Sequence, residues 1–132
     1  MKTEAGLAFE NVSPILRVES LAASIDYYVR VLGFKLDWES PGIIASVSRG
    51  RCGIFLCEGD QGNPGGWVWV GVGDVERLFE EYSGKGARIR HPPQMSAHFR
   101  LNQRLVIQQG TAPSEYQQCD LVPWTCWIRA VA

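Results

Sequence analysis

The chain has 132 residues, of which 45% are hydrophobic and 20% are charged, and its formal net charge is −1. This length favours one domain over residues 1–132, with enough residues to bury a hydrophobic core. The balanced charge gives no support to nucleic-acid binding, and no apolar run approaches the roughly 18 residues of a membrane span. Because the N-terminal residues also lack the apolar centre of a signal peptide, we expect a cytoplasmic protein with no nucleic-acid or membrane partner.

The four cysteines stand at positions 52, 57, 119 and 126 and form no CxxC pair. Disulfides are rare in the reducing cytoplasm, and zinc sites usually need closely spaced ligands. We therefore expect free thiols and neither a disulfide nor a zinc site.

The first 60 residues predict a strand, a helix and three more strands. Residues 11–18 alternate as a strand does, and Pro14 indicates the start of that strand or an edge position. Ser20 is a suitable N-cap for the following helix, and Gly33 ends that helix as a C′ glycine. At helical spacing the helix has one apolar face, formed by Leu21, Ile25, Tyr28 and Leu32.

Three short strands follow this helix, at 34–40, 43–49 and 52–59. The turns between them are short, at 41–42 and 50–51, so neighbouring strands are expected to run antiparallel. A turn-rich link, residues 60–66, separates this first module, 9–60, from the rest of the chain.

The pattern restarts with the segment WVWVGV at residues 67–72. Alternation in a strand places Trp67, Trp69 and Gly71 on one face and the three valines on the other. We expect the valines to belong to the core. The tryptophans either line a cavity or pack in the core, where each indole N–H would need a partner.

A second helix and strand follow this segment. Asp74 is the expected N-cap, and Gly84 and Gly86 end the helix before a strand at 87–91. The helix has an apolar stripe, formed by Val75, Leu78, Phe79 and Tyr82. A shift of 54 residues therefore superposes the two halves of the chain, with Tyr28 on Tyr82, which predicts two copies of a strand–helix–strands unit.

The last part of the chain, residues 95–132, has a different composition, with only two acidic residues. Strands at 98–109 and 121–131, joined by a loop at 110–116, would complete a second module, 66–132. Their patterning is poor, so the sequence leaves open whether they complete that module or form a foreign tail.

Two segments carry a resemblance to a known family. The segment ILRVESLAASIDYYVRVLGFKL resembles the opening of the vicinal oxygen chelate superfamily, and WVWVGVGDVERLFEEYSGKGARI resembles the start of its second module. That superfamily includes glyoxalase I, extradiol dioxygenases and bleomycin-resistance proteins. The resemblance covers residues 9–93 and implies an α+β fold in which two βαβββ modules form a curved mixed sheet around a cavity.

The resemblance fails at the metal ligands. Superfamily enzymes hold a divalent metal through residues such as His and Glu, one of them near the start of each module's first strand. The matching positions here are Ser13 and Trp67, and the only histidines are His91 and His98. We therefore expect no metal, no other cofactor and no catalytic residue, as in the metal-free bleomycin-resistance proteins, which are similar in this respect and bind a drug between two subunits.

Five residues are expected to line a ligand cavity, namely Trp67, Trp69, Trp38, Phe55 and Cys57. Each has an alternative role in packing. Aromatic walls suit a small guest that is hydrophobic or planar and that can be cationic, at about 0.5–2 kcal/mol for each stacking or cation–π contact. The leading hypothesis is a homodimeric protein that sequesters a drug or antibiotic.

Two other functions stay open. A metal-dependent lyase or dioxygenase could use atypical ligands such as Glu58 and His91, although a shared fold says little about function. Alternatively, an incomplete second module would leave a sheet edge exposed, which favours a ligand-free interaction module that pairs with another chain.

Overall fold

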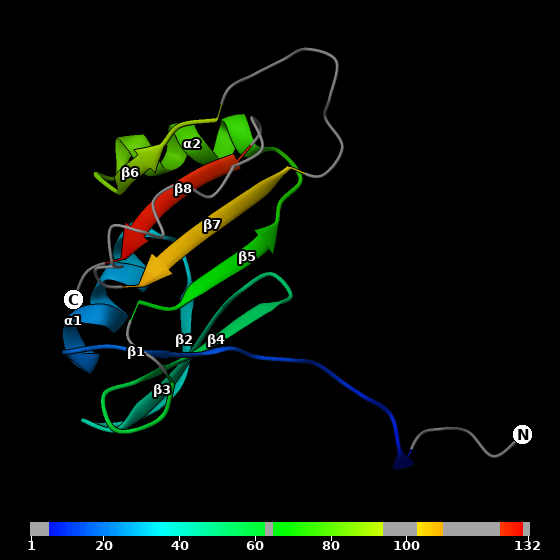
Figure 1. Cartoon of the computed structure of the whole chain (residues 1–132), viewed down its shortest axis with the longest axis vertical. Helices are drawn as coiled ribbons and strands as arrows, with labels where there is room; N and C mark the ends of the chain where they lie inside the picture. Colours follow the sequence, from blue (N-terminus) through cyan, green and yellow to red (C-terminus); the bar gives the residue numbers. More distant parts are fainter. Residues whose placement is uncertain (1–5, 63–64, 94–102, 110–124, 131–132) are drawn as a thin grey trace, which may run out of the picture.

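The computed structural model describes residues 6–62, 65–93, 103–109 and 125–130 (Figure 1). Its elements in chain order are β1 (Ile15–Arg17), α1 (Leu21–Asp26), the π-helical turn η2 (Tyr27–Val31), β2 (Lys35–Ser40), β3 (Ile44–Arg49), β4 (Cys52–Cys57), β5 (Trp67–Gly71), α2 (Val75–Gly84), β6 (Arg88–His91), β7 (Arg104–Gln109) and β8 (Thr125–Ala130). The predicted loop at 110–116, His98 and Cys119 lie outside the described residues.

Both predicted helix starts are confirmed, and the same chemistry produces them. The Ser20 side chain accepts a hydrogen bond from the Ala23 N–H at 3.2 Å, and Asp74 Oδ1 accepts one from the Arg77 N–H at 3.1 Å. Each cap satisfies a backbone donor that has no partner inside its helix. The first helix then widens into η2 and ends before Gly33, whose φ of 76° is strained for any residue with a Cβ.

The first sheet has the strand order β1-β4-β3-β2. β1 pairs with β4 in parallel, and β2, β3 and β4 are antiparallel neighbours. The predicted three-stranded meander is therefore confirmed. Pro14 directly precedes β1, which agrees with its expected place at the start of a strand.

The second sheet has a different order, β5-β7-β8-β6. Here β7 and β8 are parallel neighbours at the centre, and β5 and β6 pair with them in antiparallel fashion. Relative to the first sheet, the last two strands have exchanged places. At the centre of this sheet β7 and β8 bring matching apolar residues into register, Leu105 with Cys126 and Ile107 with Ile128, and all four side chains are buried.

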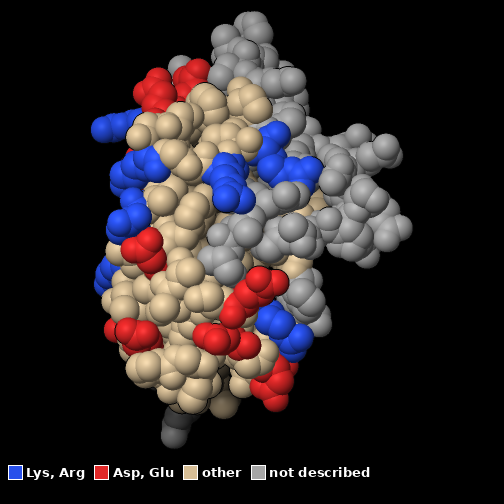
Figure 2. Space-filling view, turned by 90° about the vertical axis from the view of Figure 1, so that its left-hand side faces the viewer, with Lys and Arg blue, Asp and Glu red and all other residues tan. Residues whose placement is uncertain are grey.

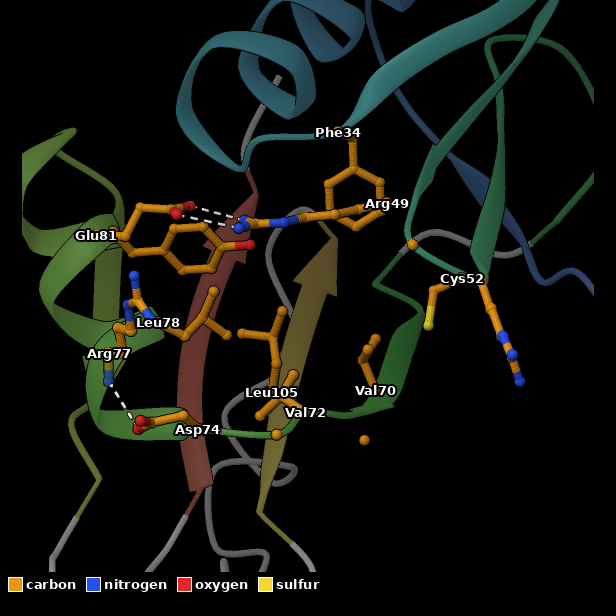
Figure 3. Close-up of a pocket in the computed structure, with 15 residues that line it drawn as sticks. Phe34, Arg49, Cys52, Val70, Val72, Asp74, Arg77, Leu78, Glu81 and Leu105 are labelled. Carbon is orange, nitrogen blue, oxygen red and sulfur yellow. Dashed lines mark hydrogen bonds and ion pairs between the residues drawn. The ribbon is translucent and has the colours of Figure 1, made fainter.

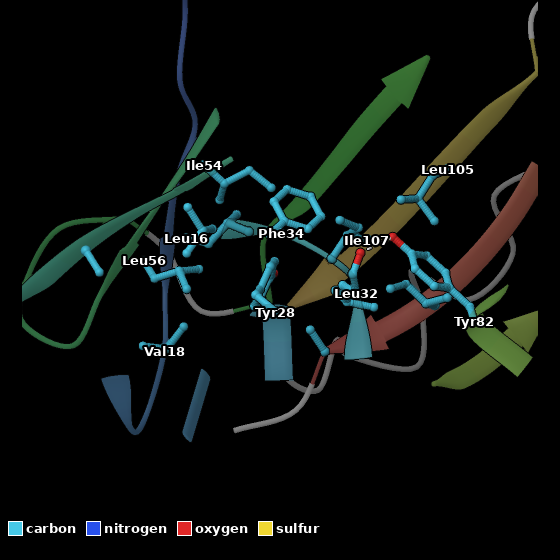
Figure 4. Close-up of a cluster of buried hydrophobic side chains, with 14 of the residues drawn as sticks. Leu16, Val18, Tyr28, Leu32, Phe34, Ile54, Leu56, Tyr82, Leu105 and Ile107 are labelled. Carbon is cyan, nitrogen blue, oxygen red and sulfur yellow. Dashed lines mark hydrogen bonds between the residues drawn. The ribbon is translucent and has the colours of Figure 1, made fainter. Parts of the chain in front are cut away.

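One hydrophobic cluster draws on both sheets and both helices (Figure 4). Leu16, Ile54 and Leu56 enter it from the first sheet, and Leu105 and Ile107 enter it from the second. Between them lie residues of η2 and the following segment, namely Tyr28, Leu32 and Phe34. The predicted apolar faces of the two helices are thus part of the core, and the α+β fold is confirmed.

The described residues of the face in Figure 2 carry both signs of charge, with most basic side chains in its upper half and most acidic ones in its lower half. None of the described helices is long and apolar enough to cross a membrane. Among the described residues, Cys52, Cys57 and Cys126 are free thiols, as expected.

Candidate functional site

The side of the first sheet that faces away from the core has a row of three residues in register. Trp38 pairs with Ser46, and Ser46 pairs with Phe55 on the next strand. Because serine is small, the two aromatic rings approach each other across it, with centroids 5.8 Å apart and planes at 51°. Trp38 is 49% exposed, so the structure leaves a large indole surface available beside Phe55.

A β-bulge turns a second side chain onto this face. The register shifts between Leu36 and Trp38, so Asp37 is the extra residue. Its carboxylate accepts hydrogen bonds from Ser46 Oγ at 3.3 Å and from Ser48 Oγ at 2.9 Å, and Lys35 Nζ lies 3.7 Å away. The bulge therefore sets a carboxylate beside the aromatic pair.

These residues line a cavity of about 370 Å³, which we call the aromatic pocket. Its floor is formed by the outward residues of β2, β3 and β4. Its rim includes Ser13 from the segment before β1 and Arg51 from the turn between β3 and β4. The pocket can offer a guest an aromatic pair set among serines, one carboxylate and one guanidinium.

The predicted site residues fall into two groups. Trp38 and Phe55 come together in the aromatic pocket, whereas Trp67 and Trp69 lie on β5 of the second sheet and do not line it. Trp69 is 61% exposed and Trp67 is half-buried. As predicted, the valines that alternate with them pack against the core.

Cys57, the fifth predicted residue, is only 2% exposed and does not line the aromatic pocket. The reason lies in the segment after β4, where a Cβ on Gly59 would come within 3.9 Å of Cys57 Sγ. That segment then passes β1 so closely that a Cβ on Gly62 would be 2.7 Å from the Ile15 carbonyl oxygen. The segment after β4 therefore lies against the Cys57 thiol, although alternation along β4 alone predicts that this side chain is exposed.

Sequence reasoning missed Asp37, Ser46 and Ser48. A signal was present, because aspartate is disfavoured inside strands and often indicates a bulge when it interrupts an apolar and aromatic run. Serine at every second position of β3, opposite the buried Ala45 and Val47, indicates a face that is not part of the core.

The family model for the glyoxalase/bleomycin resistance protein/dioxygenase superfamily matches residues 10–99. The chain belongs to this superfamily. No curated protein matches the chain.

Solved structures of other proteins share the fold. The bleomycin-binding protein from bleomycin-producing Streptomyces verticillus, solved with copper(II)-bleomycin, has a TM-score of 0.57 at 16% identity, over 95% of this chain and 98% of that one. TioX from Micromonospora sp. ML1 has a TM-score of 0.57 at 20% identity, over 92% and 98%. A glyoxalase/bleomycin resistance protein/dioxygenase superfamily member from Sphaerobacter thermophilus DSM 20745 has a TM-score of 0.56 at 16% identity, over 96% of this chain and 99% of that one.

The residues that the structure describes do not fit a divalent metal of the kind that superfamily enzymes use. Within the described parts of the chain, no group of three His, Cys, Asp or Glu residues lies close enough to hold an ion. In the aromatic pocket the one carboxylate, Asp37, is already engaged by two serine hydroxyls. Glu58 accepts a hydrogen bond from the Leu21 N–H at 3.0 Å, at the start of α1, and His91 ends β6 in the other sheet.

Proposed function

We propose that this superfamily member binds a small, flat, apolar molecule over Trp38 and Phe55 in the aromatic pocket, and that it sequesters this molecule without reacting with it. The observation that carries the proposal is the exposed indole of Trp38, which is tilted against Phe55 on the open face of a sheet. An indole exposed to this extent beside a cavity is available for stacking at about 0.5–1.5 kcal/mol beyond the area that it buries.

The Asp37 side of the pocket suits a guest group that carries a positive charge or a hydrogen-bond donor, whereas Arg51 places a positive charge elsewhere on the rim. Asp37 supplies a fixed acceptor at one side of the ring pair. A cation stacked on Trp38 would gain a cation–π contact of about 0.5–2 kcal/mol as well as attraction to that carboxylate. The volume of about 370 Å³ is in the range of small-molecule pockets and suits a guest of two or three fused rings.

The proposal of sequestration follows from the chemistry of the lining residues. Among the described residues of the pocket, the hydroxyls of Ser46 and Ser48 donate to Asp37, and no histidine lines the pocket as a general base for these serines or for Ser13. Cys57 is buried away from the pocket. The bleomycin-binding protein with copper(II)-bleomycin is a precedent for drug binding on this fold, and it supports an antibiotic as one class of guest.

We also propose a homodimer. The segment 6–12 runs away from the body of the molecule (Figure 1) and exposes Leu7, Phe9 and Val12. Apolar side chains that protrude in this way favour contact with another chain. In a dimer, Trp67 and Trp69 of one copy could complete the wall of a binding groove, and their role in ligand binding stays a prediction.

The test is a fluorescence titration of the purified protein with proflavine, a planar cation, and with copper(II)-bleomycin. We expect quenching with at least one of them and a loss of about tenfold or more in affinity for Trp38→Ala. Ile43→Ala is the matched control, because it removes an exposed apolar side chain next to the same sheet that does not line the pocket. Equal loss in both variants, or a failure of both proflavine and copper(II)-bleomycin to bind, would contradict the proposal.

A further inference from the structure

A second and larger cavity, of about 620 Å³, lies at the junction of the two modules (Figure 3). One wall is the end of β3 with the following turn, and the opposite wall is α2. The end of β5 and residues 72–74 form a third side. None of the five residues predicted from the sequence lines this junction cavity, and only Gly50 and Arg51, in the turn between β3 and β4, border both cavities.

The interior of the junction cavity is apolar. Its side chains come from both modules and point toward one another in Figure 3, namely Phe34, Val70, Val72, Leu78 and Leu105. Binding pockets typically combine such a surface with a few fixed polar groups and have volumes of about 300–1,000 Å³. The junction cavity falls inside that range.

The charges of the side chains that line the junction cavity do not sum to zero. Arg49 and Glu81 neutralise each other through two hydrogen bonds, of 2.7 and 3.0 Å. Asp74 uses its carboxylate as the cap of α2. Arg51 and Arg77 have neither an ion pair nor a side-chain hydrogen bond within the described residues, so three arginines against two carboxylates give the lining one excess positive charge.

We propose that the junction cavity is a separate binding site for a small amphipathic carboxylate. The tail of the guest lies against the apolar interior, and its carboxylate accepts hydrogen bonds from Arg77, with Arg51 on the opposite side contributing positive charge. A guanidinium binds a carboxylate through two parallel, charge-assisted N–H donors, whereas a neutral hydroxyl offers a single uncharged acceptor and an ammonium offers none. The site is therefore selective for the charge of the head group.

The arrangement gives Arg77 the larger role. It stands on α2 one turn before Glu81, close enough that its charge contributes to the lowered pKa of that carboxyl, after the larger effects of Arg49 and Lys85. Glu81 is held by Arg49, so among the described residues nothing engages the donors of the Arg77 guanidinium. Arg51 borders both cavities, so Arg77 is the position at which the junction cavity can be tested by itself.

Octanoate is a suitable probe of the junction cavity. Octylamine and 1-octanol are the comparison compounds, because they have an eight-carbon tail with a cationic and a neutral head group, respectively. Cys52 lines the cavity, whereas Cys57 and Cys126 are buried. We expect octanoate to slow the alkylation of Cys52 by iodoacetamide, as measured by peptide mass spectrometry, and octylamine to leave that rate unchanged. Calorimetric affinity for octanoate should fall about tenfold in Arg77→Gln, the size of one lost charge-assisted contact.

Arg30→Gln is the matched control, because it removes the same charge from an exposed position of the first module, where Arg30 pairs with Asp26. It should bind octanoate as the wild type does. Arg77→Lys keeps the charge but not the paired donors, and it should bind with an intermediate affinity. Equal binding of the three probes, or equal losses in the Arg77 and Arg30 variants, would overturn the proposal. Proflavine binding is expected to be unaffected by Arg77→Gln, so this test is distinct from that of the aromatic pocket.

Discussion

Tyr28 and Tyr82 occupy equivalent positions of the two modules, 54 residues apart, and each donates a hydrogen bond to the other module. Tyr28 Oη donates to Gln109 Oε1 at 3.0 Å, and Tyr82 Oη donates to the Leu32 carbonyl oxygen at 2.8 Å. Both rings are completely buried. The two modules are therefore joined by a reciprocal pair of buried hydrogen bonds as well as by apolar packing.

Loss of each of these two hydrogen bonds should lower the free energy of unfolding by a different amount. Tyr28→Phe leaves the buried Gln109 oxygen without this donor, so we expect a loss of about 1–3 kcal/mol in the free energy of unfolding. Tyr82→Phe should cost only about 1 kcal/mol, because the Leu32 carbonyl still accepts from Arg49 at 2.9 Å. Urea unfolding of both variants measures the difference, and the opposite ranking would contradict this account.

Alkaline pH should destabilise the protein. Burial raises the pKa of Tyr28 and raises the pKa of Tyr82 to about 12, against an ordinary value of 10.0. The folded state thus holds these phenolic protons more tightly than the unfolded state. The resulting contribution to the free energy of unfolding is fully present below pH 10 and is lost as the pH rises through 12. Unfolding monitored by circular dichroism, with phenolate absorbance in parallel, should show it. Tyr82→Phe should flatten the dependence, and stability that stays constant from pH 9 to 12 would be against the prediction.

Acid should weaken the contact between β3 and α2. The hydrogen bonds from Arg49 are the largest cause of a lowered pKa of Glu81, relative to the usual 4.5. The resulting stability is present above pH 4.5 and is lost as the pH falls through the folded-state value. We expect Glu81→Gln to lose about 1 kcal/mol at pH 7 and to be less sensitive to acid. Asp26→Asn, in the exposed Asp26–Arg30 pair, is the control and should lose no more than about 0.5 kcal/mol.

The described cysteines should differ in reactivity. Burial raises the pKa of the Cys126 thiol to about 11, so its nucleophilic thiolate is scarce at neutral pH. Cys52 is only partly buried. Time-resolved alkylation at pH 8 should modify Cys52 well before Cys126 in the folded protein, and the two rates should converge in denaturant. Faster modification of Cys126 in the native protein would show that its surroundings are open.

The charge of the guest in the aromatic pocket can be tested at the bulge. Asp37→Asn keeps the shape of the side chain and removes its negative charge. If a planar cation binds beside Asp37, its affinity should fall several-fold, by about 1 kcal/mol, because a charge-assisted contact is lost. Acridone, a neutral planar compound, should be affected little. Fluorescence titration of the variant with proflavine and acridone compares the two, and equal effects would argue against a role for the charge.

Much of the fold could be predicted from the sequence, because the signals are local. The caps at Ser20 and Asp74, the glycine at the end of the first helix and the apolar face of each helix depend on residues within one or two turns. The equivalence of Tyr28 and Tyr82 followed from the 54-residue shift. Alternation along β5 likewise predicted that its valines face the core, and the structure agrees.

The site could be predicted only in part, because alternation assigns a residue to a face of a strand but does not identify the strand beside it or the chain above it. Trp38 and Phe55 meet because β3 lies between β2 and β4 with a serine at the point of contact. The exchange of β7 and β8, the bulge at Asp37 and the cover over Cys57 all depend on contacts between distant segments. The sequence by itself therefore determined the elements, their core faces and the absence of the usual metal ligands. Only tertiary packing decided which aromatic residues line a pocket, because a pocket forms between residues of different strands and not along a single strand.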